Sequence, residues 1–148
     1  MIFDELTQAE LEIVDLAGVP RHYAKGARIV EEEQAGDAFF MIIAGRVEVR
    51  KNIVGGQYRR LAELGPCDIF GEICFLGVPN RSASVVALTD GTALEFSRAT
   101  FAHLVEQHPL IGLKTYRGFA RELAQRMAKL DDDLRDALLW ALNETRKK

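Results

Sequence analysis

Between residues 20 and 97 the chain consists of short β-prone runs that are interrupted by glycine. The clearest runs are Phe39 to Ile43 and Arg46 to Arg50. In the second run Val47 and Val49 alternate with charged residues, which predicts a strand with one buried face and one face in water. Short strands separated by turn residues predict an antiparallel sandwich or barrel.

Glycine also marks the turns of this region. Gly45 separates the two clearest runs, and Val54-Gly55-Gly56-Gln57 is typical of a hairpin tip. This tip leads into a predicted strand from Tyr58 to Leu64, and the last strand is expected near Ala93 to Phe96.

Helices are predicted on both sides of the β region. Thr7-Gln8-Ala9-Glu10 has the capping-box pattern, in which Thr7 accepts from the third helical N–H and Glu10 reaches back to the cap. We expect a helix to begin there and to end at Gly18 and Pro20. After the β region, Phe101, Leu104 and Val105 form an apolar stripe on a short helix that His108-Pro109 ends.

A much longer helix is predicted from about Leu110 to Thr145, although Gly118 weakens its early part. Its apolar residues recur at steps of three and four: Phe119, Leu123, Met127, Leu130, Leu134 and Leu138. The simplest interpretation is packing against the barrel alone. A small barrel covers only the first turns of such a stripe, so we expect the distal half to meet a second copy of the chain in a twofold homodimer.

Composition agrees with one domain, because 148 residues of which 48% are hydrophobic can fill a core. We therefore predict a single domain over 1–148. It comprises an N-terminal helical segment (1–19), the barrel (20–97) and the C-terminal helices (98–148).

Charge argues against broad attraction to nucleic acid or anionic lipid, because the net charge is -3 and the sequence pI is about 5.6. There is no apolar run long enough for a membrane span, and the start Met1-Ile2-Phe3-Asp4-Glu5 lacks a basic leader. We expect a cytoplasmic protein without membrane contact. Cys67 and Cys74 are expected to be free thiols.

No residue pattern suggests catalysis. His22, His103 and His108 are scattered, so the His-x-His cluster of a metal-dependent β barrel is absent. A nucleophile elbow, a phosphate-loop lysine motif and an acid/base carboxylate pair are not evident either. We predict neither a metal site nor an enzyme.

The stretch from residue 69 to residue 87 carries the candidate chemistry, because it places Glu72 and Arg81 in a segment otherwise built for burial. If a strand runs on from Arg81, alternation puts that arginine on one face with Ala83, Val85 and Ala87. A buried guanidinium needs an anion, and Gly71-Glu72 opens a short helix whose N-terminus offers free N–H groups. Either Glu72 pairs with Arg81 internally, or the two form a small phosphate site.

Phe70-Gly71-Glu72 followed by Arg81-Ser82-Ala83-Ser84 resembles the phosphate-binding cassette of the cyclic nucleotide-binding domain family. That family includes the catabolite activator protein and the regulatory subunit of protein kinase A. The resemblance implies a mainly β fold with flanking helices, namely a double-stranded β-helix (jelly-roll-like antiparallel barrel) plus a long C-terminal α-helix. It also implies that the ligand is a 3',5'-cyclic nucleotide, cAMP or cGMP, with no other cofactor.

By this resemblance Glu72 accepts from the ribose 2'-hydroxyl and Arg81 pairs with the cyclic phosphate. The implied ligand-binding residues are Phe70, Gly71, Glu72, Ile73, Arg81, Ser82 and Ala83, and the possible base contacts on the long helix are Arg126 and Met127. Ser82 is compatible with adenine and with guanine.

Two positions depart from the family pattern. Cys67 and Glu33 stand where relatives often have glycine. If those glycines adopt a positive φ angle, the side chains here must tolerate that conformation at a cost of about 1 kcal/mol.

The sequence therefore predicts a regulatory domain that binds a cyclic nucleotide and couples binding to movement of its C-terminal helix, acting on an unidentified downstream protein. One alternative is a Crp/Fnr-type transcriptional regulator or a fragment of one. Such regulators carry a helix-turn-helix after the long helix, and none is visible before Lys148, so the chain alone is not expected to bind DNA directly. The other alternative is a dimerisation scaffold whose cassette binds nothing.

Overall fold

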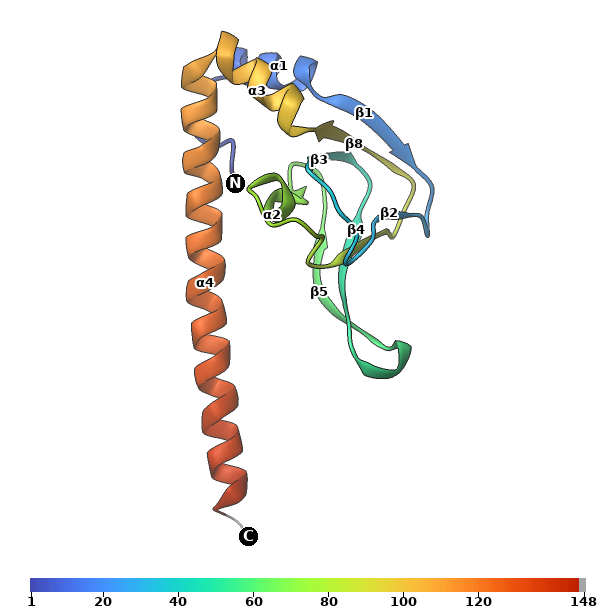
Figure 1. Cartoon of the computed structure of the whole chain (residues 1–148), viewed down its shortest axis with the longest axis vertical. Helices are drawn as coiled ribbons and strands as arrows, with labels where there is room; N and C mark the ends of the chain where they lie inside the picture. The colour runs from blue at the N-terminus through green and yellow to red at the C-terminus, as the bar shows by residue number, and fades with distance from the viewer. Residues whose placement is uncertain (147–148) are drawn as a thin grey trace.

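The computed structural model describes residues 1–146 and contains two antiparallel sheets of four strands each (Figure 1). In the first sheet the order is β1 (Val19–Tyr23), β8 (Gly91–Phe96), β3 (Phe39–Ala44) and β6 (Ile69–Phe70). In the second sheet the order is β2 (Arg28–Val30), β7 (Ser84–Ala87), β4 (Val47–Asn52) and β5 (Tyr58–Leu64). Strands far apart in the chain are thus neighbours, and the predicted jelly-roll-like barrel is confirmed.

The predicted helices are confirmed as well. Helix α1 (Gln8–Ala17) begins with the expected capping box, because Thr7 Oγ1 accepts from Glu10 N at 3.2 Å and Thr7 N donates to Glu10 Oε2 at 2.8 Å. Helix α3 (Arg98–Gln107) is followed at once by α4 (Pro109–Thr145), which is 37 residues long. A four-residue helix, α2 (Glu72–Phe75), and the 3-10 turn η1 (Val54–Gly56) complete the fold.

One strand prediction needs correction. We expected alternation to begin at Arg81, but β7 begins at Ser84, and all four of its residues are buried. Residues 81–83 are irregular, with Ser82 exposed and Ala83 half-buried. Arg81 therefore does not share a strand face with Ala83, although its burial was predicted correctly.

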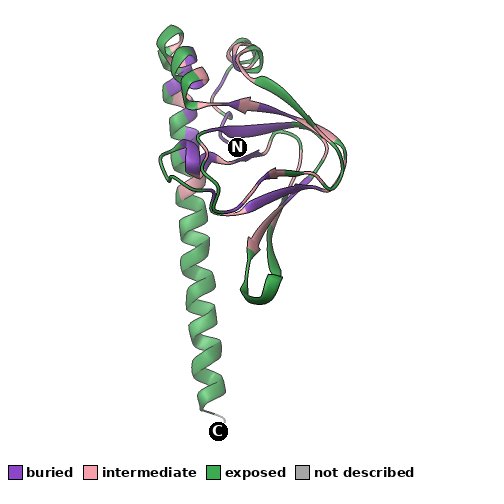
Figure 2. Cartoon of the chain, turned by 45° about the vertical axis from the view of Figure 1, so that its right-hand side comes forward, coloured by how far each residue is buried: buried purple, intermediate pink, exposed green. Residues whose placement is uncertain are grey.

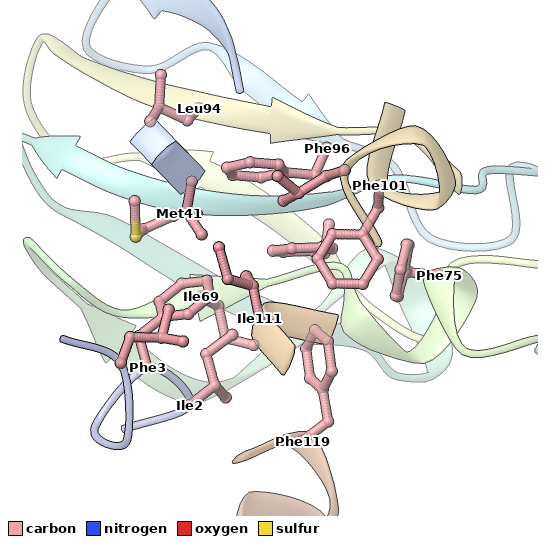
Figure 3. Close-up of a cluster of buried hydrophobic side chains, with 14 residues drawn as sticks. Ile2, Phe3, Met41, Ile69, Phe75, Leu94, Phe96, Phe101, Ile111 and Phe119 are labelled. Atoms are coloured by element: carbon pink, nitrogen blue, oxygen red, sulfur yellow. The ribbon is translucent and has the colours of Figure 1, made fainter. Parts of the chain in front are cut away.

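The larger core cluster lies between the first sheet and the helices (Figure 3). The Phe39 ring contacts the rings of Phe75, Phe96, Phe101 and Phe119 at centroid distances of 4.8 to 5.8 Å. These partners come from α2, β8, α3 and α4. The cluster therefore joins the short helix beside the cassette to the start of the long helix.

The N-terminal segment adds Ile2 and Phe3 to the same cluster, beside α4 (Figure 3). Ion pairs hold the segment and α1 against α4, because Glu5 pairs with Arg121 and Glu10 Oε2 lies 2.7 Å from Lys114 Nζ. The first three turns of α4 thus pack on the N-terminal segment and α1.

The distal half of α4 extends beyond the barrel and is exposed along its whole length (Figure 2). Its exposed residues include large apolar ones, namely Met127, Leu130, Leu134, Leu138, Leu139, Trp140 and Leu142. Among residues 1–146, no helix has both the length and the apolar character that are needed to cross a membrane.

Candidate phosphate and ribose site

Arg81 is the most deeply buried arginine of the site, with 8% of its surface exposed. Its Nη1 donates to the carbonyl of Ala38 at 2.8 Å and to that of Gly71 at 3.1 Å. The guanidinium also lies near the Phe40 ring, 5.9 Å from its centroid. These contacts hold the arginine in place, but none of them neutralises its charge.

Among residues 1–146, Arg81 forms no ion pair, and its Nε and Nη2 groups donate no hydrogen bond. Burying an unpaired charge is costly, and the free Nε–Nη2 edge is the one with which arginine binds an anion through two parallel hydrogen bonds. This arrangement favours a phosphate ligand over a structural role alone.

Two glycines make room for the guanidinium. A Cβ at Gly36 would lie 2.4 Å from Arg81 Nε, and a Cβ at Gly71 would lie 2.8 Å from Arg81 Nη1. Gly71 also has a φ of +82°, which favours glycine on conformational grounds. Gly36, which precedes β3, therefore borders the site.

The backbone of Arg81 is fixed by the turn that contains Glu33. Arg81 N donates to Gln34 O at 2.8 Å, and Glu33 N donates to Arg81 O at 2.9 Å. The φ of Glu33 is +69° and that of Cys67 is +72°, so both positions have the backbone conformation expected where relatives carry glycine. The Glu33 turn is distant from the cassette in sequence but adjacent to it in space.

Glu72 is the first residue of α2 and is 5% exposed. It does not pair with Arg81. Instead its Oε1 contacts Arg126 Nη1 of α4, so the alternative of an internal Glu72–Arg81 ion pair is wrong. The first N–H groups of α2 have no partner within that helix.

The predicted base-contacting residues are placed differently from one another. Arg126 reaches the cassette through its contact with Glu72, whereas Met127 is 66% exposed. Glu122, one turn before Arg126, is half-buried, and its burial raises the pKa of that carboxyl. Neighbouring Glu72 raises that pKa further, while Arg126 lowers it.

The remaining cassette residues lie in the same stretch, from residue 69 to residue 87. Phe70 is buried and stacks on Phe40 at a centroid distance of 4.9 Å, and Ile73 is half-buried. The carbonyl of Ser82 accepts from Lys51 Nζ at 2.7 Å. The Ser82 hydroxyl forms no hydrogen bond within residues 1–146, and Ser82 is exposed.

A buried carboxylate, that of Glu32, contacts the lysine that donates to Ser82. Glu32 Oε1 lies 2.7 Å from Lys51 Nζ, and Glu32 Oε2 accepts from Asn52 N at 2.9 Å. The hydrogen bond from Lys51 lowers the pKa of Glu32. Sequence reasoning missed this pair, because Glu32 lies in the turn after β2 and Lys51 lies in β4, and no local pattern joins them.

The cassette offers hydrogen-bond donors and the carboxylate of Glu72. Within residues 1–146 no group of three or more His, Cys, Asp or Glu side chains could hold a metal ion. A guanidinium edge, helix N–H groups and a nearby acceptor can bind an anion attached to a hydroxyl-bearing group.

Fold and site together define a β-barrel domain with flanking helices and a buried arginine that has no ion pair within residues 1–146. A model of the cyclic nucleotide-binding domain matches residues 20–108. The chain therefore belongs to the cyclic nucleotide-binding domain family.

Curated relatives include regulators and kinases. The chain is 30% identical over 145 residues to the cyclic AMP receptor protein of Thermus thermophilus, covering 95% of this chain and 67% of the relative. It is 31% identical to the cGMP-dependent protein kinase, isozyme 1, of Drosophila melanogaster, covering 72% of this chain and 14% of the kinase. The family model that matches here is a binding domain, and the kinase match spans only a small part of that enzyme.

Among solved structures, the catabolite activator protein of Thermus thermophilus has a TM-score of 0.78 and 32% identity. The match covers 88% of this chain and 61% of that one. The chain spans about half the length of the CRP-like cAMP-activated global transcriptional regulator of Mycobacterium tuberculosis, to which it is 26% identical over 113 residues.

Proposed function

We propose that this chain is a regulatory domain that binds a purine 3',5'-cyclic nucleotide, cAMP or cGMP, and converts binding into movement of α4. Membership of the cyclic nucleotide-binding domain family supports this proposal. We further expect it to act in the cytoplasm through a protein partner and to catalyse no reaction.

One observation carries the proposal: Arg81 is buried without a counter-anion among residues 1–146. A cyclic phosphate has one negative charge on two free oxygens, so the Nε–Nη2 edge of Arg81 matches it in charge and geometry. In this proposal Gly71, Ser82 and Ala83 surround the phosphate. Glu72 accepts a hydrogen bond from the ribose 2'-hydroxyl.

The base is the part of the ligand with the fewest candidate contacts. Met127 and Arg126 on α4 and the hydroxyl of Ser82 are the side chains we propose for it. None of them selects adenine over guanine by its chemistry, since each can lie against either purine.

The proposed output is a population shift. A phosphate bound by Arg81 draws the cassette inward, and Phe75 of α2, which packs on Phe119 of α4, transmits the displacement. We also propose that two copies associate through the exposed apolar residues of distal α4, because a helical stripe of this length needs a covering partner.

Calorimetric titration with cAMP and with cGMP tests the binding proposal. Arg81→Ala removes two charge-assisted hydrogen bonds and is expected to weaken binding about 100-fold or more. Arg46→Ala, an exposed arginine outside the cassette, is the control and should bind as wild type does. Thermal unfolding of each variant confirms that the fold is retained. Wild-type protein that binds neither nucleotide at millimolar concentration contradicts the proposal.

A second candidate is a transcriptional regulator of which this chain is one part. The 30% identity to the Thermus receptor across 95% of the chain favours it. Sequencing the gene beyond the codon of Lys148 and measuring DNA binding with and without cAMP would distinguish it from a stand-alone sensor. A scaffold with a non-binding cassette is the third candidate, and native mass spectrometry would show it as a dimer without nucleotide.

A further inference from the structure

The peptide bond that joins Ser82 to Ala83 lies between two anchored residues. On one side, the N–H and the C=O of Arg81 bond to the turn at residues 33–34. On the other side, Ser84 begins β7 and is paired with β4. Residues 82 and 83 themselves belong to no strand. The orientation of the peptide bond between them is therefore not set by a sheet ladder.

One side chain contacts this peptide bond. Lys51 of β4 donates from Nζ to the carbonyl of Ser82 at 2.7 Å. Within residues 1–146, the N–H of Ala83 donates no hydrogen bond. The carbonyl and the N–H of a trans peptide bond point in opposite directions, so a cation that holds the carbonyl also sets the direction of the N–H.

Lys51 is held in turn by a buried carboxylate. Glu32 Oε1 lies 2.7 Å from Lys51 Nζ, and the Glu32 side chain is 6% exposed. The other carboxylate oxygen, Oε2, accepts from Asn52 N at 2.9 Å, and Glu32 N donates to Ser84 Oγ at 2.9 Å. Glu32 is thus fixed through its carboxylate and through its backbone, which gives Lys51 Nζ a defined position beside the Ser82 carbonyl.

We propose that Lys51 is a positioning residue for phosphate binding: it holds the Ser82 carbonyl so that the N–H of Ala83 points at one of the two free oxygens of the cyclic phosphate. This inference rests on the proposed function. Lys51 acts through the peptide bond and does not need to touch the ligand. Its charge also polarises the peptide group, which makes the N–H a stronger donor.

The proposal distinguishes the two phosphate oxygens. Arg81 has donors for both of them, whereas the single N–H of Ala83 points at one. The Rp and Sp diastereomers of the cyclic phosphorothioate cAMPS differ in which free oxygen is replaced by sulfur, a weaker acceptor. One diastereomer therefore keeps the oxygen that faces Ala83, and the other diastereomer lacks it.

The test measures dissociation constants of cAMP, Rp-cAMPS and Sp-cAMPS for wild type and for variants of Lys51. Lys51→Met should weaken binding of cAMP and of one diastereomer about tenfold, and should change binding of the other diastereomer less than about twofold. Lys51→Arg, which keeps the charge and the donors, should restore most of the affinity. Lys25→Met is the matched control and should bind all three ligands as wild type does, because Lys25 is exposed and its side chain forms no hydrogen bond or ion pair within residues 1–146.

Lys51→Met leaves the carboxylate of Glu32 without its cation, and an unpaired buried charge destabilises a fold. The double variant Glu32→Gln/Lys51→Met removes both charges and keeps an acceptor for Asn52 N. It should show the same pattern across the three ligands, with thermal unfolding as the check that the fold is retained.

Each remaining result overturns a defined statement. If the double variant binds all three ligands as wild type does, the positioning role of Lys51 is wrong. An equal loss of affinity for all three ligands would also exclude that role, because it would not depend on the oxygen that faces Ala83. Both results would leave the proposed function intact. Failure of wild type to bind any of the three ligands would refute the proposed function and the role of Lys51 together.

Discussion

Gly118 in α4 lies directly against the backbone of the N-terminal segment. A Cβ at this position would lie 2.0 Å from the carbonyl oxygen of Ile2 and 2.6 Å from its Cα. Both atoms belong to the backbone, so no side-chain rotation relieves the clash. We predict that Gly118→Ala forces the N-terminal segment away from α4.

The magnitude follows from what that segment buries. Ile2 is 1% exposed and Phe3 is 7% exposed. Full burial of such a side chain contributes about 1.5–3 kcal/mol, so exposure of both would cost about 3–6 kcal/mol. Alanine improves helix propensity over glycine by about 1 kcal/mol. The net expectation is a loss of about 2–5 kcal/mol in the free energy of unfolding.

Urea denaturation of four proteins tests this prediction: wild type, Gly118→Ala, and each of them without residues 1–3. In the truncated background the clash is gone, and the same substitution should stabilise the protein by about 1 kcal/mol. Gly118→Ala must therefore lower the free energy of unfolding of the full-length chain and raise that of the truncated chain. If Gly118→Ala stabilises the full-length chain, the close packing of Ile2 on α4 is wrong.

Three further predictions concern other parts of the molecule. Leu134→Glu should halve the particle mass in light scattering, because it puts charge on the proposed dimer seam, and an unchanged mass would exclude that seam. Cys67→Gly should raise the free energy of unfolding by about 1 kcal/mol, whereas Cys67→Ala, which keeps a Cβ at φ +72°, should not. The pKa of Glu32 is lowered by Lys51, so its contribution to stability is present above its unfolded pKa and is lost as pH falls through its folded pKa. Glu32→Gln should therefore flatten the acid limb of a stability-pH profile, and an unchanged limb would contradict this coupling.

Features that depend on neighbouring residues were predicted well from the sequence. The capping box at Thr7 and Glu10 is present as expected, and β5 covers Tyr58–Leu64 as predicted. In both cases the stabilising contacts, or the alternation that implies them, lie within one short segment. The same holds for the long helix, whose apolar spacing was sufficient to place it.

Features that depend on distant residues were predicted incompletely. Alternation suggested that a strand begins at Arg81, but the N–H and C=O of Arg81 bond to the turn of Gln34 and Glu33 and are not available to a sheet ladder. The Glu72–Arg126 contact was missed for the same reason, because it requires knowing how α4 lies over the cassette. Sequence patterns supplied the candidate residues, and only the tertiary arrangement supplied their partners.

Helix α2 is attached to α4 at both ends, and this has a mechanical consequence. Phe75 packs on Phe119 at a ring-centroid distance of 5.7 Å, and Glu72 contacts Arg126. Phe119 and Arg126 lie seven residues apart, about 10 Å along a rigid helix, so a displacement of α2 acts on α4 at two points and tilts it as a unit. Thr145 lies 19 residues beyond Arg126, about 28 Å further along the axis, and a tilt of about 10° would move it about 5 Å. A small change at the cassette would thus be largest at the exposed apolar end of α4, where we propose that a second copy binds.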